Sequence, residues 1–353
     1  MSNKEVIVGA GFSAGIAKLL ISTAKVYGAK DHKIAAKNCK YHRPFLASNK
    51  LLSRRSHSYG SLYVSKSTVN LHDRLVIDGN SAIWGGFINS RKIPANFKKI
   101  LSAREIKISK LSIGATGSYS NNGSIGQLTN KAGKVMTASD ILPNIKNAYL
   151  KKIYVKNKKI MLEFINGVSC KEIVYAKFVV LCIGTVQLID LLYQSKLISE
   201  GDEIELNEFS HNIKLEKTNK KNTEKKKMGI KSTQIKFTLL RALFHYIGLQ
   251  HNKINFNLMN KFTLQISQSF MPKINRCTFK IISANLVPIN YTDNFGDSIH
   301  YCNMKINGVD INKFLKKIHP KIIGLGMPFV NQKNPGPISN DIILDAHKKF
   351  RGI

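Results

Sequence analysis

The sequence predicts an α/β fold in which a parallel sheet with attached helices is interleaved with an antiparallel sheet. Residues 6–8 form a short apolar run that leads into a glycine-rich turn and then into apolar residues at helical spacing. Residues 178–183 form a continuous apolar run, typical of a parallel strand buried on both faces, and a glycine and a second helical pattern follow. Residues 148–175 and 232–292 instead alternate in the manner of antiparallel strands.

Length and composition indicate a packed globular chain. The 353 residues are 43% hydrophobic and 22% charged, which excludes wholesale disorder and suits one large α/β domain or two interleaved ones. The 24 Gly and 9 Pro show no G-X-Y period, which excludes a collagen-like class. The apolar run at 178–183 is far shorter than the ~20 residues needed to span a bilayer, so we expect a soluble protein.

The chain carries a large excess of positive charge. The 55 Lys and Arg against 21 Asp and Glu give a net charge of +34, which raises nucleic acid or an anionic membrane as partners. However, 46 of these residues are Lys spread along the chain, whereas phosphate-reading surfaces usually cluster Arg. General surface solvation is therefore the preferred interpretation; nucleic acid is not expected as a partner, and weak contact with anionic surfaces stays open. The Lys-rich residues 214–231 are expected to form an exposed loop, with a phosphate-binding loop as the alternative.

The cysteines indicate a reducing compartment. There are five, which is an odd number, no C-x-x-C occurs, and Cys182 lies within an apolar run. Free thiols in a cytoplasmic protein fit this pattern better than a disulfide framework. No metal-ligand spacing is visible, so no metal is expected. Glu5 and the glycine motif argue against a signal peptide.

The opening segment, residues 5–31, is typical of a strand, a glycine turn, a helix and a second strand. Residues 6–8 are the first strand, apolar residues recur at helical spacing to about Thr23, and residues 25–29 are the next strand. This βαβ order is the context in which a glycine turn binds a dinucleotide.

The turn itself has the form G-x-G-x-x-A. Gly9 permits a tight turn, Gly11 lets the backbone approach a pyrophosphate, and Ala14 is small enough for the helix to pack on the strand. Phe12 and Ser13 lie at the helix N-terminus, whose dipole favours an anion. The alternative is a glycine-rich turn that binds no ligand.

Two further segments offer contacts to such a ligand. Asp31 lies 22 residues after the first glycine, where an acidic residue binds the adenosine ribose; a surface aspartate in a turn is the alternative. Residues 78–89 contain the one tryptophan, Trp84, followed by Gly85, and end at Asn89. Such a loop can place backbone and an aromatic plane against a large flat ligand, although an ordinary buried tryptophan in a turn fits the composition too.

The middle of the chain predicts more strands. Three antiparallel strands are expected at residues 150–155, 159–165 and 171–175. The strand at 178–183 ends at Gly184, where a helix follows and where nucleotide cofactors bind in such sheets. Residues 112–140 are interpreted as a loop. Residues 232–292 are expected to form an antiparallel wall with a helical piece at 239–249.

The order of these features resembles the glucose–methanol–choline family of flavin oxidoreductases over about half of the chain. The matching segments are VIVGAGFSAG at 6–15, GNSAIWGGFIN at 79–89, YAKFVVLCIGTVQLIDLL at 175–192, IHYCNMKINGVD at 299–310 and GLGMPFVNQKNPGPISNDIILDAH at 324–347. The chain departs from the family pattern at Ile183, where the family has alanine, and at Asn303 and Met304, where it has Gly-Thr. The resemblance implies an FAD-binding domain formed by residues 1–50, 76–204 and 295–353, with a substrate region at 51–75 and 205–294.

The resemblance also implies a function. It makes the chain an FAD-dependent oxidoreductase acting on a CH–OH group of a sugar or related alcohol, with the electron acceptor left open. His300 is the base and Asn334 its hydrogen-bonding partner, while Pro335 opens the last helix beside the flavin. Gly184 and Ile153 are two further residues that are expected to contact the cofactor.

The chemistry of these residue types agrees with that assignment. Oxidation of an alcohol needs a hydride acceptor and a group that takes the hydroxyl proton, and histidine suits the second role near neutral pH. Proline at a helix start costs nothing because that N–H has no helical partner. His211 is the alternative substrate-side histidine. A flavoprotein that modifies RNA and a degenerate, non-catalytic flavin-binding protein remain as alternative functions.

Overall fold

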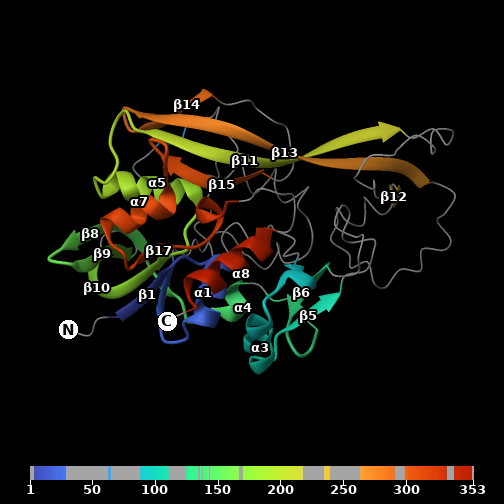
Figure 1. Ribbon diagram of the computed structural model, residues 1–353, viewed down its shortest axis with the longest axis horizontal. Helices are drawn as coiled ribbons and strands as arrows, with labels where there is room; N and C mark the ends of the chain where they lie inside the picture. The colour runs from blue at the N-terminus through green and yellow to red at the C-terminus, as the bar shows by residue number, and fades with distance from the viewer. Residues whose placement is uncertain are drawn as a thin grey trace.

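A computed structural model describes residues 4–28, 63–64, 88–110, 125–133, 136, 138–142, 144–166, 170–217, 234–238, 263–290, 299–331 and 338–351. Within these residues the chain forms two large sheets, a small third sheet, and helices that cover both faces of the first (Figure 1). This is the α/β class that the sequence predicts. None of the helices in these residues combines the length and the hydropathy that a membrane-spanning helix needs.

The first sheet is mixed and has the order β7-β2-β1-β10-β9-β8, with β17 also paired to β10. Its strands are β1 (Lys4–Val8), β2 (Lys25–Gly28), β7 (Lys146–Asn147), β8 (Tyr149–Lys156), β9 (Lys159–Asn166), β10 (Cys170–Leu181) and β17 (Ile322–Gly324). The strands β7, β2, β1, β10 and β17 run parallel, whereas β8, β9 and the first half of β10 form an antiparallel meander. The predicted βαβ opening is confirmed, because β1 and β2 are parallel neighbours joined through a helix.

Strand β10 belongs to both parts of this sheet. Residues 170–176 pair antiparallel with β9, and residues 176–181 pair parallel with β1. The sequence predicts two strands here, at 171–175 and 178–183, and that division is wrong. The pattern changes from alternating to continuous apolar because the strand passes from the meander into the parallel sheet, where both faces are covered.

Helices cover the first sheet on opposite faces. The described helices are α1 (Phe12–Leu20), α3 (Ala95–Ala103), α4 (Ala138–Ile141), α5 (Thr185–Gln194), α7 (Ile311–Ile318) and α8 (Ile338–Lys349). Of these, α1, α4 and α8 pack on one face of the sheet, and α5 and α7 pack on the other. The side chain of Ile7 packs with α1, α4 and α8, while those of Val6 and Val8 pack in a second core with α5 and α7. This alternation along one strand, with both faces buried, explains why residues 6–8 are all apolar.

The second sheet contains the antiparallel wall predicted for residues 232–292, together with strands from residues 63–64, 203–217 and 299–310 that the sequence does not predict. The helical piece expected at 239–249 lies outside the described residues. Its order is β16-β15-β11-β13-β14-β3, with β12 beside β13. The strands are β3 (Tyr63–Val64), β11 (Glu203–Lys217), β12 (Gln234–Thr238), β13 (Thr263–Ile282), β14 (Asn285–Asn290), β15 (Ile299–Ile306) and β16 (Val309–Asp310). All pairs are antiparallel except β14 with β3. The inner ends of β11, β13 and β15 pack on α5 and α7, so this sheet lies over the first (Figure 1).

A small third sheet includes one strand from residues 112–140, which are interpreted from sequence as a loop. It consists of β4 (Ile88–Asn89), β5 (Lys107–Lys110) and β6 (Ile125–Thr129). Strand β6 lies inside residues 112–140 and α4 begins there, so that interpretation is wrong for these residues. Glycine is required at residue 126, since a Cβ there would lie 2.3 Å from the carbonyl oxygen of Ser109 on β5. Two short 3-10 helices complete the described elements, η4 (Ser90–Lys92) and η8 (Met327–Phe329).

Helix α7 begins with a side-chain cap, which gives a direct test of the fold. The carboxylate of Asp310 accepts hydrogen bonds from the backbone N–H groups of Asn312, at 2.9 Å, and Lys313, at 3.3 Å. Replacing Asp310 by alanine is expected to lower the free energy of unfolding by about 1 kcal/mol, measured by urea denaturation. Asp310→Asn keeps the acceptor and should change it by only a few tenths of a kcal/mol. Equal losses in both variants would show that the cap is not the cause.

Candidate functional site

Three strand–glycine loops meet at the carboxyl edge of the parallel sheet. The strands β1, β10 and β17 end side by side, because Cys182 N–H donates to the Val8 carbonyl at 2.7 Å and Leu325 N–H to the Leu181 carbonyl at 2.9 Å. Helices α1 and α5 then leave β1 and β10 on opposite faces of the sheet. This is a topological switch point, the place in an open α/β sheet where ligands bind.

At the end of β1, the backbone conformation and the close packing at residue 9 both require glycine. Its φ of +136° is a conformation that residues with a side chain rarely adopt. A Cβ at Gly9 would lie 2.2 Å from the carbonyl oxygen of Cys182. On the opposite side Gly28, at the end of β2, would place a Cβ 2.9 Å from the Cβ of Ala10. Glycine therefore lets the turn after β1 fit tightly between the ends of its two neighbours.

The turn leads into α1, whose N-terminus faces the same edge. Gly11 is the N-cap residue and contributes no side-chain hydrogen bond, and Phe12 and Ser13 are the first helical residues. No acidic side chain lies in the first turn, so the positive end of the helix dipole is not neutralised locally. Ala14 is fully buried, which lets the helix approach the sheet closely. The local arrangement suits a bound phosphate or pyrophosphate.

The third loop comes from the far end of the chain and closes on α1. Gly326 has a φ of +125°, and a Cβ there would lie 2.8 Å from Ser13 Oγ. This glycine was not among the residues singled out from sequence. Its signal was present, since the apolar pair Ile322 and Ile323 followed by Gly324 repeats the strand–glycine pattern of the other two loops. The C-terminal segment therefore returns to the start of α1, next to the glycine turn at residues 9–11.

Strand β15 of the second sheet borders the same edge. The carbonyl of Tyr301 accepts a hydrogen bond from Thr185 Oγ1 at 3.4 Å, beside Gly184 at the start of α5. Further along β15, the N–H of Asn303 donates to the Val330 carbonyl at 2.9 Å. His300 precedes Tyr301 in this strand, and its backbone pairs with that of Phe209. Its backbone thus lies next to the residue that contacts α5, and its role as base stays a prediction.

Several predicted contacts lie outside the described residues. They are Asp31, Trp84, Gly85, Asn334 and Pro335, together with most of the Lys-rich segment, residues 218–231. His211 lies in β11, where only the backbone is described. The family-like run at 299–310 forms the hairpin of β15 and β16, with Gly308 in its two-residue turn.

Asn89 and Ile153 have partners within the protein. Asn89 Oδ1 accepts the N–H of Arg91 at 3.0 Å and thereby caps η4. Ile153 is buried in β8, and its N–H donates to Ser195 Oγ at 2.9 Å. Both predicted cofactor contacts stay predictions, and any contact with Ile153 would have to leave this hydrogen bond in place.

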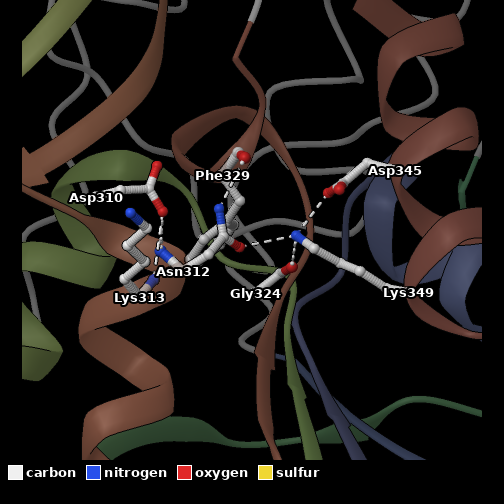
Figure 2. A network of polar contacts seen from close by, with 7 residues as sticks. All are labelled: Asp310, Asn312, Lys313, Gly324, Phe329, Asp345 and Lys349. Carbon is white, nitrogen blue, oxygen red and sulfur yellow. Dashed lines mark hydrogen bonds and ion pairs between the residues drawn. The ribbon is translucent and has the colours of Figure 1, made fainter.

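A partly buried lysine, Lys349, joins the C-terminal elements behind this edge (Figure 2). Lys349 Nζ donates to Gly324 O at 2.8 Å, Asn312 Oδ1 at 2.8 Å and Asp345 Oδ2 at 2.7 Å. Asn312 Nδ2 in turn donates to the Phe329 carbonyl at 3.2 Å. Burial lowers the pKa of Lys349, and the neighbouring Asp345 carboxylate opposes that shift. The network joins α7, α8 and β17, so it holds the loop that follows β17 in place against the two helices.

Three cysteines of the described residues are buried thiols. Cys182, Cys277 and Cys302 are buried and form no disulfide. Burial raises the pKa of the Cys182 thiol far above its usual range, so this thiol is neutral at physiological pH. No group of three or more His, Cys, Asp or Glu side chains in the described ranges is placed to hold a metal ion.

Comparison with known proteins finds only remote likeness. No protein-family model and no curated protein matches the sequence. Among solved structures, AlpK is similar with a TM-score of 0.35 and 10% identity over 98% of this chain and 61% of that one. CabE, an aromatic hydroxylase from angucycline biosynthesis, has a TM-score of 0.33 and 8% identity over 99% of this chain and 61% of that one. A flavoprotein/dehydrogenase from Cytophaga hutchinsonii has a TM-score of 0.28 and 10% identity over 83% of this chain and 73% of that one. The chain thus spans about 61% of the length of the first two, and TM-scores this low support no inference about function on their own.

Proposed function

We propose that the chain is an FAD-dependent oxidoreductase whose cofactor lies across the carboxyl edge of the parallel sheet. The observation that carries the proposal is the turn at Gly9, which has no space for a side chain against Cys182 and leads into the uncapped start of α1. Residues 9–14 would hold the pyrophosphate through backbone N–H groups and the helix dipole. The residues present therefore fit the adenosine diphosphate half of the cofactor.

The return of the C-terminal segment favours FAD over a nicotinamide cofactor. The pairing of β17 with β10 and the approach of Gly326 to Ser13 bring residues 322–331 to the dinucleotide turn. A nicotinamide dehydrogenase has no need of such a segment, whereas a flavin, whose ring system is large, needs protein on its far side. The C-terminal residues would supply it.

For the reaction we propose oxidation of a CH–OH group of a sugar or related alcohol. Bound FAD would supply the hydride acceptor. His300 would take the hydroxyl proton as the C–H hydride departs, leaving a carbonyl product, and Asn334 would hold the substrate oxygen. The support is the resemblance at 299–310 and 324–347, together with the place of β15 along the sheet edge. The substrate pocket would lie between this edge and the second sheet.

The cofactor is tested on the purified protein as it is isolated. We expect a yellow protein with an absorbance band near 450 nm, and mass spectrometry of the compound released on denaturation should identify FAD. A colourless protein that binds only NAD(H) in titration calorimetry would refute the flavin assignment. A colourless protein that binds ADP and takes up added FAD would retain it.

The catalytic assignment needs a separate measurement. With an alcohol that reduces the flavin, His300→Ala should lower the rate of flavin reduction by about 10²- to 10⁴-fold, the usual contribution of a general base. His319→Ala is the control, because His319 lies after α7 and accepts the N–H of Lys321 rather than bordering the sheet edge. Equal rates in His300→Ala and the wild type would remove His300 from the mechanism. His211→Ala would then test the alternative histidine.

A further inference from the structure

One face of the meander formed by β8, β9 and β10 carries apolar and aromatic side chains at the surface. The register places Met161 opposite Tyr154 on β8 and opposite Tyr175 on β10, so these three side chains form one row across the strands. Ile173 lies two residues before Tyr175 and therefore on the same face, and it is 55% exposed. The hydrophobic core that contains α5 packs on the other face of the meander, which lies at the left of Figure 1.

Lysines flank this row on the same face. They lie two residues, or a multiple of two, from the members of the row along each strand, which gives their side chains the same direction. One carboxylate, Glu163, lies among the described side chains of this face, and it accepts a hydrogen bond from Tyr154 OH at 3.0 Å. The face is therefore positively charged, and its lysines are Lys152, Lys156, Lys159 and Lys171.

The tip of the β8–β9 hairpin concentrates three of the positive charges. Lys156 and Lys159 pair directly across the two strands, where like charges repel each other. Lys158, in the two-residue turn between them, has a φ of +58°, and hairpin turns of this kind prefer glycine at that position. All three lysines are exposed. The free protein holds these charges together against their repulsion, and an anionic partner would relieve it.

An anionic lipid surface fits this face better than nucleic acid or a second copy of the chain. Each lysine near such a surface strengthens binding by about fivefold through its charge alone, and tyrosine and aliphatic side chains favour the headgroup region. Nucleic acid would offer no apolar partner to Met161 or Ile173, and the sequence has no arginine from 149 to 177. A second copy docked by the same face would bring the lysines of both copies together.

We infer that this lysine face docks the protein peripherally on an anionic lipid surface. The inference goes beyond the proposed function and does not rest on it. The second sheet packs over α5 and α7, which lie on the opposite face of the first sheet, so docking would leave the second sheet turned away from the lipid. The lysine face consists of Tyr154, Met161, Ile173 and Tyr175 with Lys152, Lys156, Lys158, Lys159 and Lys171.

The test is sedimentation of the full-length protein with lipid vesicles. Vesicles of phosphatidylcholine mixed with phosphatidylserine should bind the protein, vesicles of phosphatidylcholine alone should bind it much more weakly, and added salt should weaken the binding. The double variant Lys156→Gln, Lys159→Gln should bind the anionic vesicles about 25-fold more weakly, at about fivefold for each lysine. The matched control is Lys316→Gln, Lys317→Gln, which removes the same charge from exposed positions on α7 and should stay within about twofold of the wild type.

Two single variants separate docking from folding. Lys158→Gly suits the backbone of the turn, so it should not lower the midpoint of urea denaturation, yet it should weaken binding to the anionic vesicles by about fivefold. Ile173→Thr keeps a β-branched side chain in the strand and removes exposed apolar surface, so it should weaken binding by about threefold.

Three results would overturn the inference. They are the absence of binding to anionic vesicles, equal binding to both kinds of vesicle, and equal weakening by the two double variants, which would show that only the total charge matters. A single-stranded RNA that binds where vesicles do not, and is lost in the Lys156→Gln, Lys159→Gln variant, would assign the face to nucleic acid instead. A protein that binds anionic vesicles through this face but takes up no flavin would support the inference and refute the proposed function.

Discussion

Replacing Gly9 by alanine is expected to abolish binding of ADP and FAD and to lower the free energy of unfolding by about 3 kcal/mol or more. Two costs add. The φ of +136° is strained for any residue with a side chain, at about 1–3 kcal/mol, and the new Cβ would overlap the carbonyl oxygen of Cys182, at about 1–3 kcal/mol more. Relief of that overlap would push β1 away from β10 at the sheet edge. Calorimetric titration with ADP and urea denaturation measure the two effects.

Gly133→Ala is the matched control for Gly9→Ala. Gly133 also has a positive φ, +76°, but a Cβ there would meet no atom within 4 Å. It should therefore show only the conformational cost, about 1 kcal/mol, with ADP binding unchanged. If both variants lost stability equally and both still bound ADP, the tight approach of Gly9 to Cys182 would have no role in a ligand site.

The second large effect is expected from Lys349. Replacing it by methionine keeps the aliphatic length but removes the three hydrogen bonds that Lys349 Nζ donates to Gly324 O, Asn312 Oδ1 and Asp345 Oδ2. Breaking a fully buried pair costs about 3–5 kcal/mol, and since the side chains of Lys349 and Asp345 keep exposed fractions of 19% and 22%, we expect a loss of about 2–3 kcal/mol. Lys348→Met is the control, because Lys348 is exposed and should change stability by no more than about 0.5 kcal/mol.

The loss in Lys349→Met should depend on pH. Burial raises the pKa of Asp345 above its usual value, and removal of the lysine takes away the charge that opposes this shift. A carboxyl with a raised folded-state pKa favours folding while it is protonated, and this contribution is lost as the pH rises through that pKa. The destabilisation should thus be larger at about pH 7 than at about pH 4, measured by urea denaturation at both. A loss independent of pH would show that the packing of the side chain, not its charge, holds α8.

Local pattern by itself was sufficient for the elements at the sheet edge. The strand at residues 6–8, the glycine turn, helix α1 and the apolar run at 178–183 were all predicted, because a strand buried on both faces must be apolar at every position and a tight turn demands glycine. The α/β class and the antiparallel wall followed from the same periodicities. These signals are local, since each depends only on which neighbours along the chain share a face.

Only the tertiary structure decided which elements meet. It made one strand, β10, serve both the meander and the parallel sheet, and it brought Gly326 to Ser13, Asn340 to Asn89 and Lys349 to Gly324. Each of these contacts joins residues far apart in sequence, and an asparagine whose amide bonds both backbone groups of a distant strand residue has the same local pattern as one on a surface. The amino-acid sequence thus determined that a glycine turn would form between a buried strand and a helix. The packing of the C-terminal elements determined what lies against that turn, because such packing depends on side-chain shape and hydrogen bonding between distant segments.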